Sequence, residues 1–174
     1  TFVDAEISVT TGDVRFFAAA QEKAKIKTST GDIRVENISA GSLDLSVTTG
    51  KVTLSGAACT GDVTVGVSTG KAALTAVSCR DLTSTGATGS LSLDRVTATG
   101  RFSIERSTGS VKMNGCDAAE ISVKTGTGDV TGTLLTDKVF ITATGTGRVD
   151  VPSTTTGGRC EIVTGTGDIR IQIG

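Results

Sequence analysis

The sequence predicts an all-β fold, a single-domain parallel β-helix (β-solenoid) of about nine coils with 19–20 residues each. A Thr-Gly dipeptide recurs every 19 or 20 residues, from Thr11-Gly12 to Thr166-Gly167. Apolar and polar residues alternate around each of these marker glycines, which is typical of strands with one buried face. The chain has 23 Gly and one Pro, so it has many turns and few interruptions of a sheet. Because so short a unit cannot bury its own apolar face, the coils should stack into one domain, residues 1–174.

Two main strands are expected in each coil, one before and one after the marker glycine. The residue two positions after the glycine is aliphatic in every coil: Val14, Ile33, Val52, Ala72, Leu91, Val111, Val130, Val149 and Ile169. The residue five positions before it is mostly aliphatic too: Ile7, Ile26, Leu45, Val65, Ser84, Ile104, Val123 and Ile162. Equivalent strands of successive coils should pair in parallel, about 4.8 Å apart. Further turns are expected near Gly41, Gly61 and Gly100.

The first and last coils carry separate expectations. The segment from Ala18 to Lys25 has a composition that allows one short helical turn or a loop. Three of the five Phe gather in the first coil and are expected to form an N-terminal plug: Phe2, Phe16 and Phe17. The chain stops on an apolar run without a visible cap: Ile169, Ile171, Ile173 and Gly174. A solenoid end needs a cover, so we expect this C-terminal coil to be covered by a further segment or to associate end to end with another chain.

Charge and hydropathy exclude several classes of partner. The formal net charge is −1, with both signs spread along the chain, so we expect no attraction to nucleic acid or anionic lipid. No apolar run approaches the ~20 residues of a membrane helix, so this segment should not insert into a membrane. The sequence begins with Thr1 and not with Met. We therefore expect any signal or anchor of the natural protein to lie outside this sequence.

The four cysteines are expected to be reduced core residues. Each falls in a column that other coils fill with small or aliphatic residues: Cys59, Cys79, Cys116 and Cys160. Cys59 and Cys79 would be stacked neighbours about 5 Å apart, so a disulfide between them stays open as an alternative. A zinc site is disfavoured, because the chain has no His and no Cys-x₂-Cys spacing.

Polar residues flank the marker glycines on both sides. The position after the glycine is often Asp, which favours turn formation. The Asp13/Asp32 pair is the best candidate for calcium on this edge, but Lys51, Lys71 and Arg148 interrupt any continuous row of carboxylates. The nine Thr before the glycines are interpreted as strand ends and not as an ice-binding or glycan-binding row of hydroxyls, because the residue two positions earlier is irregular.

The sequence offers little chemistry for catalysis. The chain has no His and no Tyr, so it lacks a proton shuttle of the usual kind. The outward acidic residues are scattered across coils and faces: Glu36, Asp44, Asp94, Glu105 and Glu120. We therefore expect no enzyme activity, no catalytic, cofactor-binding or metal-binding residue and no cofactor. A carbohydrate-active β-helix enzyme is the alternative, because paired carboxylates suffice for many glycosidases.

One coil breaks the alternation and is a candidate site. Ser84 and Gly86 stand where other coils have inward aliphatic residues, and the next coil has Arg106 in the same column. A buried Arg without a partner is costly. We therefore expect Glu105 or Asp81 to approach Arg106, or Arg106 to reach solvent.

The repeat unit Ser/Thr-Thr-Gly-Asp/Lys-Val/Ile-x-Val/Leu carries a resemblance. It is seen in residues 29–35, 48–54, 68–74 and 166–171. It resembles the bacterial adhesin domain of unknown function, a Thr-Gly-Asp-rich β-strand-repeat family, over essentially the whole chain. The resemblance implies a cell-envelope or extracellular β-helical protein, often attached to a membrane segment elsewhere in its chain.

These observations together favour a non-enzymatic structural or interaction module. Its stacked strands would present broad Ser/Thr-rich faces to an unknown protein or glycan ligand. An envelope-stress sensing scaffold that binds a partner protein is a further alternative.

Overall fold

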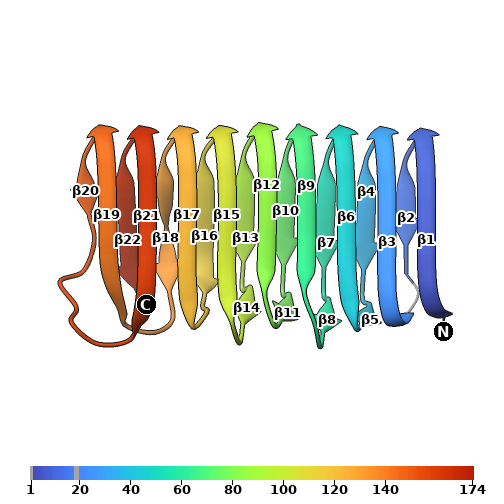
Figure 1. Cartoon of the computed structure of the whole chain (residues 1–174), viewed down its shortest axis with the longest axis horizontal. Coiled ribbons are helices and arrows are strands. Elements are labelled where there is room, and N and C mark those ends of the chain that lie inside the picture. The colour runs from blue at the N-terminus through green and yellow to red at the C-terminus, as the bar shows by residue number, and fades with distance from the viewer. Residues whose placement is uncertain (1, 18–19) are drawn as a thin grey trace.

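The computed structural model describes the backbone of residues 2–17 and 20–174, and their side chains except those of Phe2, Ala20 and Gln21. It confirms the predicted β-solenoid of about nine levels, drawn in Figure 1 as a rod with β1 at one end. Every strand pairing in it is parallel. None of the described elements is a helix with the length and apolar content of a membrane span.

Two nine-stranded sheets face each other across the core. The first, called here the long-strand sheet, has the order β1 (Phe2–Thr11), β3 (Ala20–Thr30), β6 (Ser42–Thr49), β9 (Val63–Thr69), β12 (Leu82–Thr88), β15 (Arg101–Thr108), β17 (Glu120–Thr127), β21 (Gly158–Thr166) and β19 (Lys138–Thr146). The second, the short-strand sheet, has the order β2 (Val14–Phe16), β4 (Ile33–Glu36), β7 (Val52–Ser55), β10 (Ala72–Thr75), β13 (Leu91–Asp94), β16 (Val111–Cys116), β18 (Val130–Leu134), β22 (Ile169–Ile173) and β20 (Val149–Asp150).

A third, small sheet closes the coils of the N-terminal half. Its four strands are β5 (Ser39–Ala40), β8 (Ala58–Cys59), β11 (Ser78–Cys79) and β14 (Thr97–Ala98). The predicted turns at Gly41, Gly61 and Gly100 each follow one of these short strands. The two main strands per coil are therefore confirmed, and the short third strand is an addition that the repeat pattern did not predict.

The marker glycines form the corner between the two large sheets. Gly50 has a φ of +147°, and a Cβ at this position would overlap the carbonyl oxygen of Gly31 on the neighbouring level. Its amide donates to Thr69 O at 3.0 Å, which continues the ladder around the corner. Only glycine meets both conditions, so the Thr-Gly period fixes where each coil turns.

The inward columns form one continuous core. Ile26 pairs with Leu45 in the long-strand sheet and Ile33 pairs with Val52 in the short-strand sheet, and all four are at most 1% exposed. Because each aliphatic residue lies above another, every level removes apolar surface from water at about 25 cal/mol per Å². The alternation in the sequence is therefore the main source of stability.

Residues 20–25 form neither the short helical turn nor the loop expected for the segment from Ala18 to Lys25. Residues 20–25 begin strand β3, which pairs with β1 on one side and β6 on the other. Ala24 is fully buried in the core column, and Lys23 is exposed. The period-two pattern therefore starts earlier than the composition indicated, while residues 18 and 19 lie outside the described residues.

The predicted phenylalanine plug is wrong for Phe17. Phe16 is 6% exposed and lies in the core column of β2, but Phe17 is the next residue and is 58% exposed. Adjacent residues of an extended chain point to opposite faces, so both cannot enter the core. The side chain of Phe2 lies outside the described residues.

The last two coils are stacked in the reverse of their chain order. The C-terminal strands β21 and β22 lie between β17–β18 and β19–β20, so the level at the far end of the rod is formed by residues 138–150 (Figure 1). The prediction that the C-terminal coil with Ile169, Ile171, Ile173 and Gly174 forms the uncapped end is therefore wrong.

The inward residues explain this order. Cys160 and Ile162 of β21 are fully buried, whereas their register partners on β19, Phe140 and Thr142, are only half-buried. A level inside the stack is covered on both sides, so an aliphatic inward residue such as Ile162 gains more there than its register partner Thr142 would. Strand β19 has Thr142 in the core column, so leaving it at the end level costs less free energy.

Candidate functional site

The outer face of the long-strand sheet is rich in hydroxyl groups. Its outward residues alternate with the core residues, and in the middle of the rod most are Ser or Thr. We call this surface the hydroxyl face, and its members are exposed or half-exposed: Ser42, Ser46, Thr48, Thr64, Ser68, Thr83, Thr85, Ser103, Ser107 and Ser122. Stacked strands hold them in a flat and regular array.

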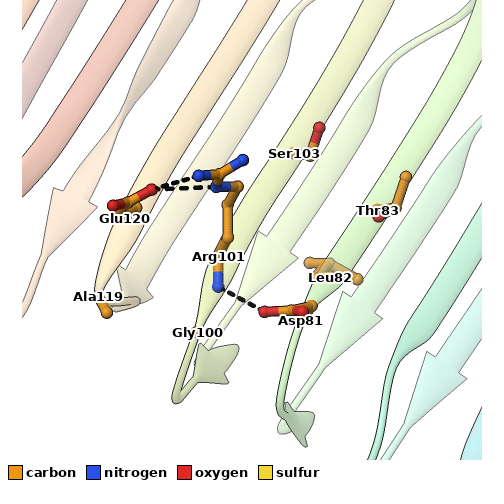
Figure 2. Close-up of a pocket in the computed structure, with 8 residues that line it drawn as sticks. All are labelled: Asp81, Leu82, Thr83, Gly100, Arg101, Ser103, Ala119 and Glu120. Carbon is orange, nitrogen blue, oxygen red and sulfur yellow. Dashed lines mark hydrogen bonds and ion pairs between the residues drawn. The ribbon is translucent and has the colours of Figure 1, made fainter.

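A groove of about 570 Å³ crosses this face where β12, β15 and β17 begin (Figure 2). It lies at the level where the small sheet ends with β14, so the corner beside it is less filled by short strands. Its lining combines acidic, basic and hydroxyl side chains with small residues: Asp81, Leu82, Thr83, Gly100, Arg101, Ser103, Ala119 and Glu120.

Arg101 lies at the centre of the groove, between two carboxylates. Its guanidinium donates to Glu120 Oε2 from Nη2 at 2.6 Å and from Nε at 3.0 Å. Its backbone amide donates to Asp81 Oδ1 at 2.8 Å, and Figure 2 shows both contacts. Gly100 permits the second contact, because a Cβ there would overlap the Asp81 carboxylate. Glu120 therefore orients the exposed guanidinium, while Asp81 anchors the backbone of Arg101.

The reversed order of the last coils extends the charged part of the groove. A smaller hollow of about 130 Å³ continues from Arg101 and Glu120 to Arg159 and Glu161 on β21. Arg159 Nη2 donates to Glu161 Oε2 at 2.6 Å. If β19 followed β17 directly, the apolar Val139 and Ile141 would take these two positions, because they are the register partners of Arg159 and Glu161. The inserted coil therefore makes this end of the groove polar.

A second depression lies closer to the marker corner. Two adjoining hollows of about 420 and 410 Å³ share Thr85, Gly86 and Ser107. The missing outward side chain of Gly66 lowers the surface there, and Glu105 and Lys124 form one rim. The depression presents hydroxyls over exposed backbone, which suits a polar ligand that approaches the sheet closely.

Arg106 lies beneath this depression, inside the core. It is 4% exposed, and its Nη2 donates to Ser84 Oγ at 3.2 Å. Its Nε and Nη1 have no hydrogen-bond partner among the described residues. Among the described residues, neither Glu105 nor Asp81 forms an ion pair with Arg106, and the Arg106 side chain does not reach solvent. Both expected outcomes are therefore wrong.

Gly86 explains the position of Arg106. A Cβ on Gly86 would overlap Arg106 Nη1, so the guanidinium fills the space that the glycine leaves in the core column. Burial lowers the pKa of Arg106. The small residues Ser84 and Gly86 are therefore the sequence signal that this core column accepts an arginine.

The four cysteines are free thiols, and all are buried: Cys59, Cys79, Cys116 and Cys160. This agrees with the core interpretation, and Cys59 and Cys79 form no disulfide in this structure. Burial raises the pKa of Cys59 and Cys116, and it raises the pKa of Cys79 and Cys160 to about 12. A thiol with so high a pKa is a poor nucleophile at neutral pH.

The aspartates after the marker glycines act as turn residues. Asp13 Oδ1 accepts the amide of Asp32 at 3.0 Å, and Asp32 Oδ1 accepts the amide of Lys51 at 2.9 Å. Asp129 and Asp168 repeat this contact at the far end. Across the described part of the chain, no group of three His, Cys, Asp or Glu residues is placed to hold a metal ion.

The acidic residues singled out from the sequence are divided among different contacts. Glu36 pairs with Arg34, Asp94 accepts from Asn114 at 3.1 Å, and only Glu120 reaches the groove. Arg101 was missed, although it lies eight residues before a marker glycine, as Glu120 does. That shared offset places the two side by side and could have predicted the pair.

Residues 1–79 match the sequence model of the Toastrack DUF4097 family, a domain family of unknown function. No curated protein and no solved structure matches the chain. The match covers the first four coils, and it assigns them no activity, ligand or location.

Proposed function

We propose that this chain is a non-enzymatic, adhesin-like interaction module of the cell envelope or cell surface, and that its hydroxyl face binds a glycan. The observation that carries the proposal is the groove at Arg101. There, the Arg101 guanidinium, paired with Glu120, and the hydroxyls of Thr83 and Ser103 line the same hollow. Sugar hydroxyls both donate and accept hydrogen bonds, so a mixed lining of this kind suits them.

The contacts of the acidic groups support binding over catalysis. Glu120 accepts two hydrogen bonds from the Arg101 guanidinium, and Asp81 accepts the Arg101 amide. A glycosidase needs one carboxyl group as a proton donor and a second as a nucleophile or base. Both acids of this groove instead accept hydrogen bonds from Arg101, Glu120 from the guanidinium and Asp81 from the backbone amide, which suits a recognition surface.

A glycan array tests the proposal. The chain should bind one class of glycan, and Arg101→Ala should weaken binding by about tenfold or more, because a hydrogen bond from a charged donor is lost. Arg34→Ala is the matched control, since Arg34 is also an exposed arginine paired with a glutamate, but it lies on the short-strand sheet. Its binding should equal that of the unchanged chain.

Two results would contradict the proposal. One is the absence of any hit across a broad array at high protein concentration. The other is binding that Arg101→Ala and Glu120→Gln leave unchanged while far-UV circular dichroism shows that both variants keep the β fold.

A further inference from the structure

The two ends of the rod differ in the backbone groups that they present. Along the marker corner, each level donates to the carbonyls of the next level toward β19–β20, as Gly12 N donates to Thr30 O at 2.9 Å and Val14 N donates to Asp32 O at 2.8 Å. The same repeat leaves the amides of Gly147 and Val149 directed outward at the β19–β20 end. It leaves the carbonyls of Thr11 and Asp13 directed outward at the β1–β2 end. One end therefore offers donors where the other offers acceptors.

Strand β19 at this end also lacks the usual protection of a sheet edge. Residues 139–147 carry no charged side chain, and Ile141 and Val149 are 46% and 43% exposed. Edge strands of monomeric proteins are commonly blunted by charges, prolines or bulges. A long, uncharged edge with exposed β-branched residues is instead typical of a strand that pairs with another chain.

The charges on the two end strands of the short-strand sheet are complementary. Each column continues by one level if a second copy is placed on the end of the rod in the same register. Asp150, whose inner neighbour is Arg170, would then face Arg15 of the second copy. Arg148, one residue after its marker glycine, would face Asp13 of the second copy in the same way. Both contacts join opposite charges.

The inward residues of the two end strands of the long-strand sheet also fit. Phe140 on β19 and Ala5 on β1 share one core column, so a large side chain would meet a small one. In the next two columns Thr142 would meet Ile7, and Thr144 would meet Val9. These six inward residues of β1 and β19 are only half-buried in the single chain: Ala5, Ile7, Val9, Phe140, Thr142 and Thr144.

We propose that the β19–β20 end of one copy docks on the β1–β2 end of a second copy, so that both large sheets continue from chain to chain in register. The contact joins two different surfaces, so it does not close on itself as a two-fold dimer does, and it adds further copies at the free end. The inference goes beyond the proposed glycan binding, because the groove lies in the middle of the rod and needs neither end.

Sedimentation of the 174-residue chain tests the contact. The mean mass should rise with concentration beyond that of a dimer, and it should fall with added salt, because exposed ion pairs are screened. Asp150→Arg should weaken association by about fivefold to tenfold, since an attraction becomes a repulsion. Adding Arg15→Asp to the same chain should restore it. Lys112→Glu is the control, because Lys112 is exposed in the same column at mid-rod.

A cysteine pair tests the register. Glu6 and Ile141 are exposed and lie six residues before their marker glycines, so they would be neighbours across the contact. A chain with both Glu6→Cys and Ile141→Cys should form a ladder of disulfide-linked oligomers under mild oxidation, and either single variant should not. The four native cysteines are buried and are present in the double variant and in both single variants.

Three results would overturn the inference. The chain could stay monomeric at all concentrations, or Asp150→Arg could associate as strongly as Lys112→Glu. Cross-linking of the Ile141→Cys single variant would show β19 pairing with β19, which is a closed dimer instead of the open stack.

Discussion

Lys138 Nζ lies 2.7 Å from Asp117 Oδ1 and ties the end level of the solenoid to its body. Lys138 begins β19, and its register partner on β21 is Gly158. The lysine stem passes close to Gly158 on its way to Asp117, which precedes β17. Lys138 is 3% exposed although it belongs to the last level of the rod. One ion pair thus spans the inserted C-terminal coil.

Asp117→Asn should lower the free energy of unfolding by about 3 kcal/mol, because it leaves the Lys138 ammonium buried without a counter-charge. Lys138→Met should cost less, since the methionine stem still packs against the glycine and no charge is left buried. Urea unfolding followed by circular dichroism measures both. Equal stability of Asp117→Asn and the unchanged chain would mean that the ion pair does not hold the end level.

The ion pair between Lys138 and Asp117 predicts that the protein loses stability in acid. Burial alone would raise the pKa of Asp117, but hydrogen bonds from Lys138, Thr136 and the Ala118 amide outweigh it and lower the pKa in the folded state. The stabilisation is therefore complete above the unfolded-state pKa of about 3.9 and is lost as the pH falls through the lower folded-state pKa. The stability difference between the unchanged chain and Asp117→Asn should hold from pH 7 to pH 5 and shrink below pH 4.

The sequence predicts the levels of the solenoid but not the order of the last two. Each level carries the Thr-Gly marker and alternating apolar residues, and a pattern with one period repeats equally well in either order. Two features distinguish the two orders. Ile162, and not Thr142, occupies the buried position inside the stack, and Lys138 contacts Asp117. These depend on which strands are neighbours, and that information lies outside any single repeat.

The candidate site was predictable in part for the same reason. The common offset of Arg101 and Glu120 from their marker glycines places them side by side once the coils are stacked. The groove around them lies where the small sheet ends with β14, and the repeat pattern did not predict this third sheet. Polar neighbours on β21 follow only from the reversed order of the last coils.

Disulfide trapping should distinguish the two orders. Lys124 on β17 pairs in register with Val163 on β21, and Val163 pairs with Ala143 on β19. A chain with Lys124→Cys and Val163→Cys should therefore cross-link within one molecule. A chain with Lys124→Cys and Ala143→Cys should not, because β21 lies between them. The opposite result, read from peptide mass spectra after oxidation in dilute solution, would show that the coils stack in chain order.

The buried thiols should make the fold sensitive to alkali. Burial, with smaller contributions from Cys59, Asp81 and Asp62, raises the pKa of Cys79 to about 12. An unfolded cysteine loses its proton near pH 8.5, so stability is constant below that pH and falls as the pH rises toward 12. Cys79→Ala should lose part of this slope at a cost of only about 1 kcal/mol at pH 7, because Ala98 already occupies the same column one level away. An unchanged alkaline slope would contradict the assignment.

The isolated guanidinium of Arg106 should cost the protein stability. Two of its nitrogens are buried without a partner among the described residues, and Ser84 accepts only one hydrogen bond from it. Arg106→Met keeps most of the volume and removes these donors, so it should raise the free energy of unfolding by about 1–2 kcal/mol. Ser84→Ala should destabilise the unchanged chain by about 1 kcal/mol and have little effect beside Arg106→Met, because the hydroxyl then has no guanidinium to satisfy. Urea unfolding of the four chains gives the coupling between the two residues. If Arg106→Met is instead the less stable chain, the guanidinium has a compensating partner, such as a buried water or anion, in the space beside Gly86.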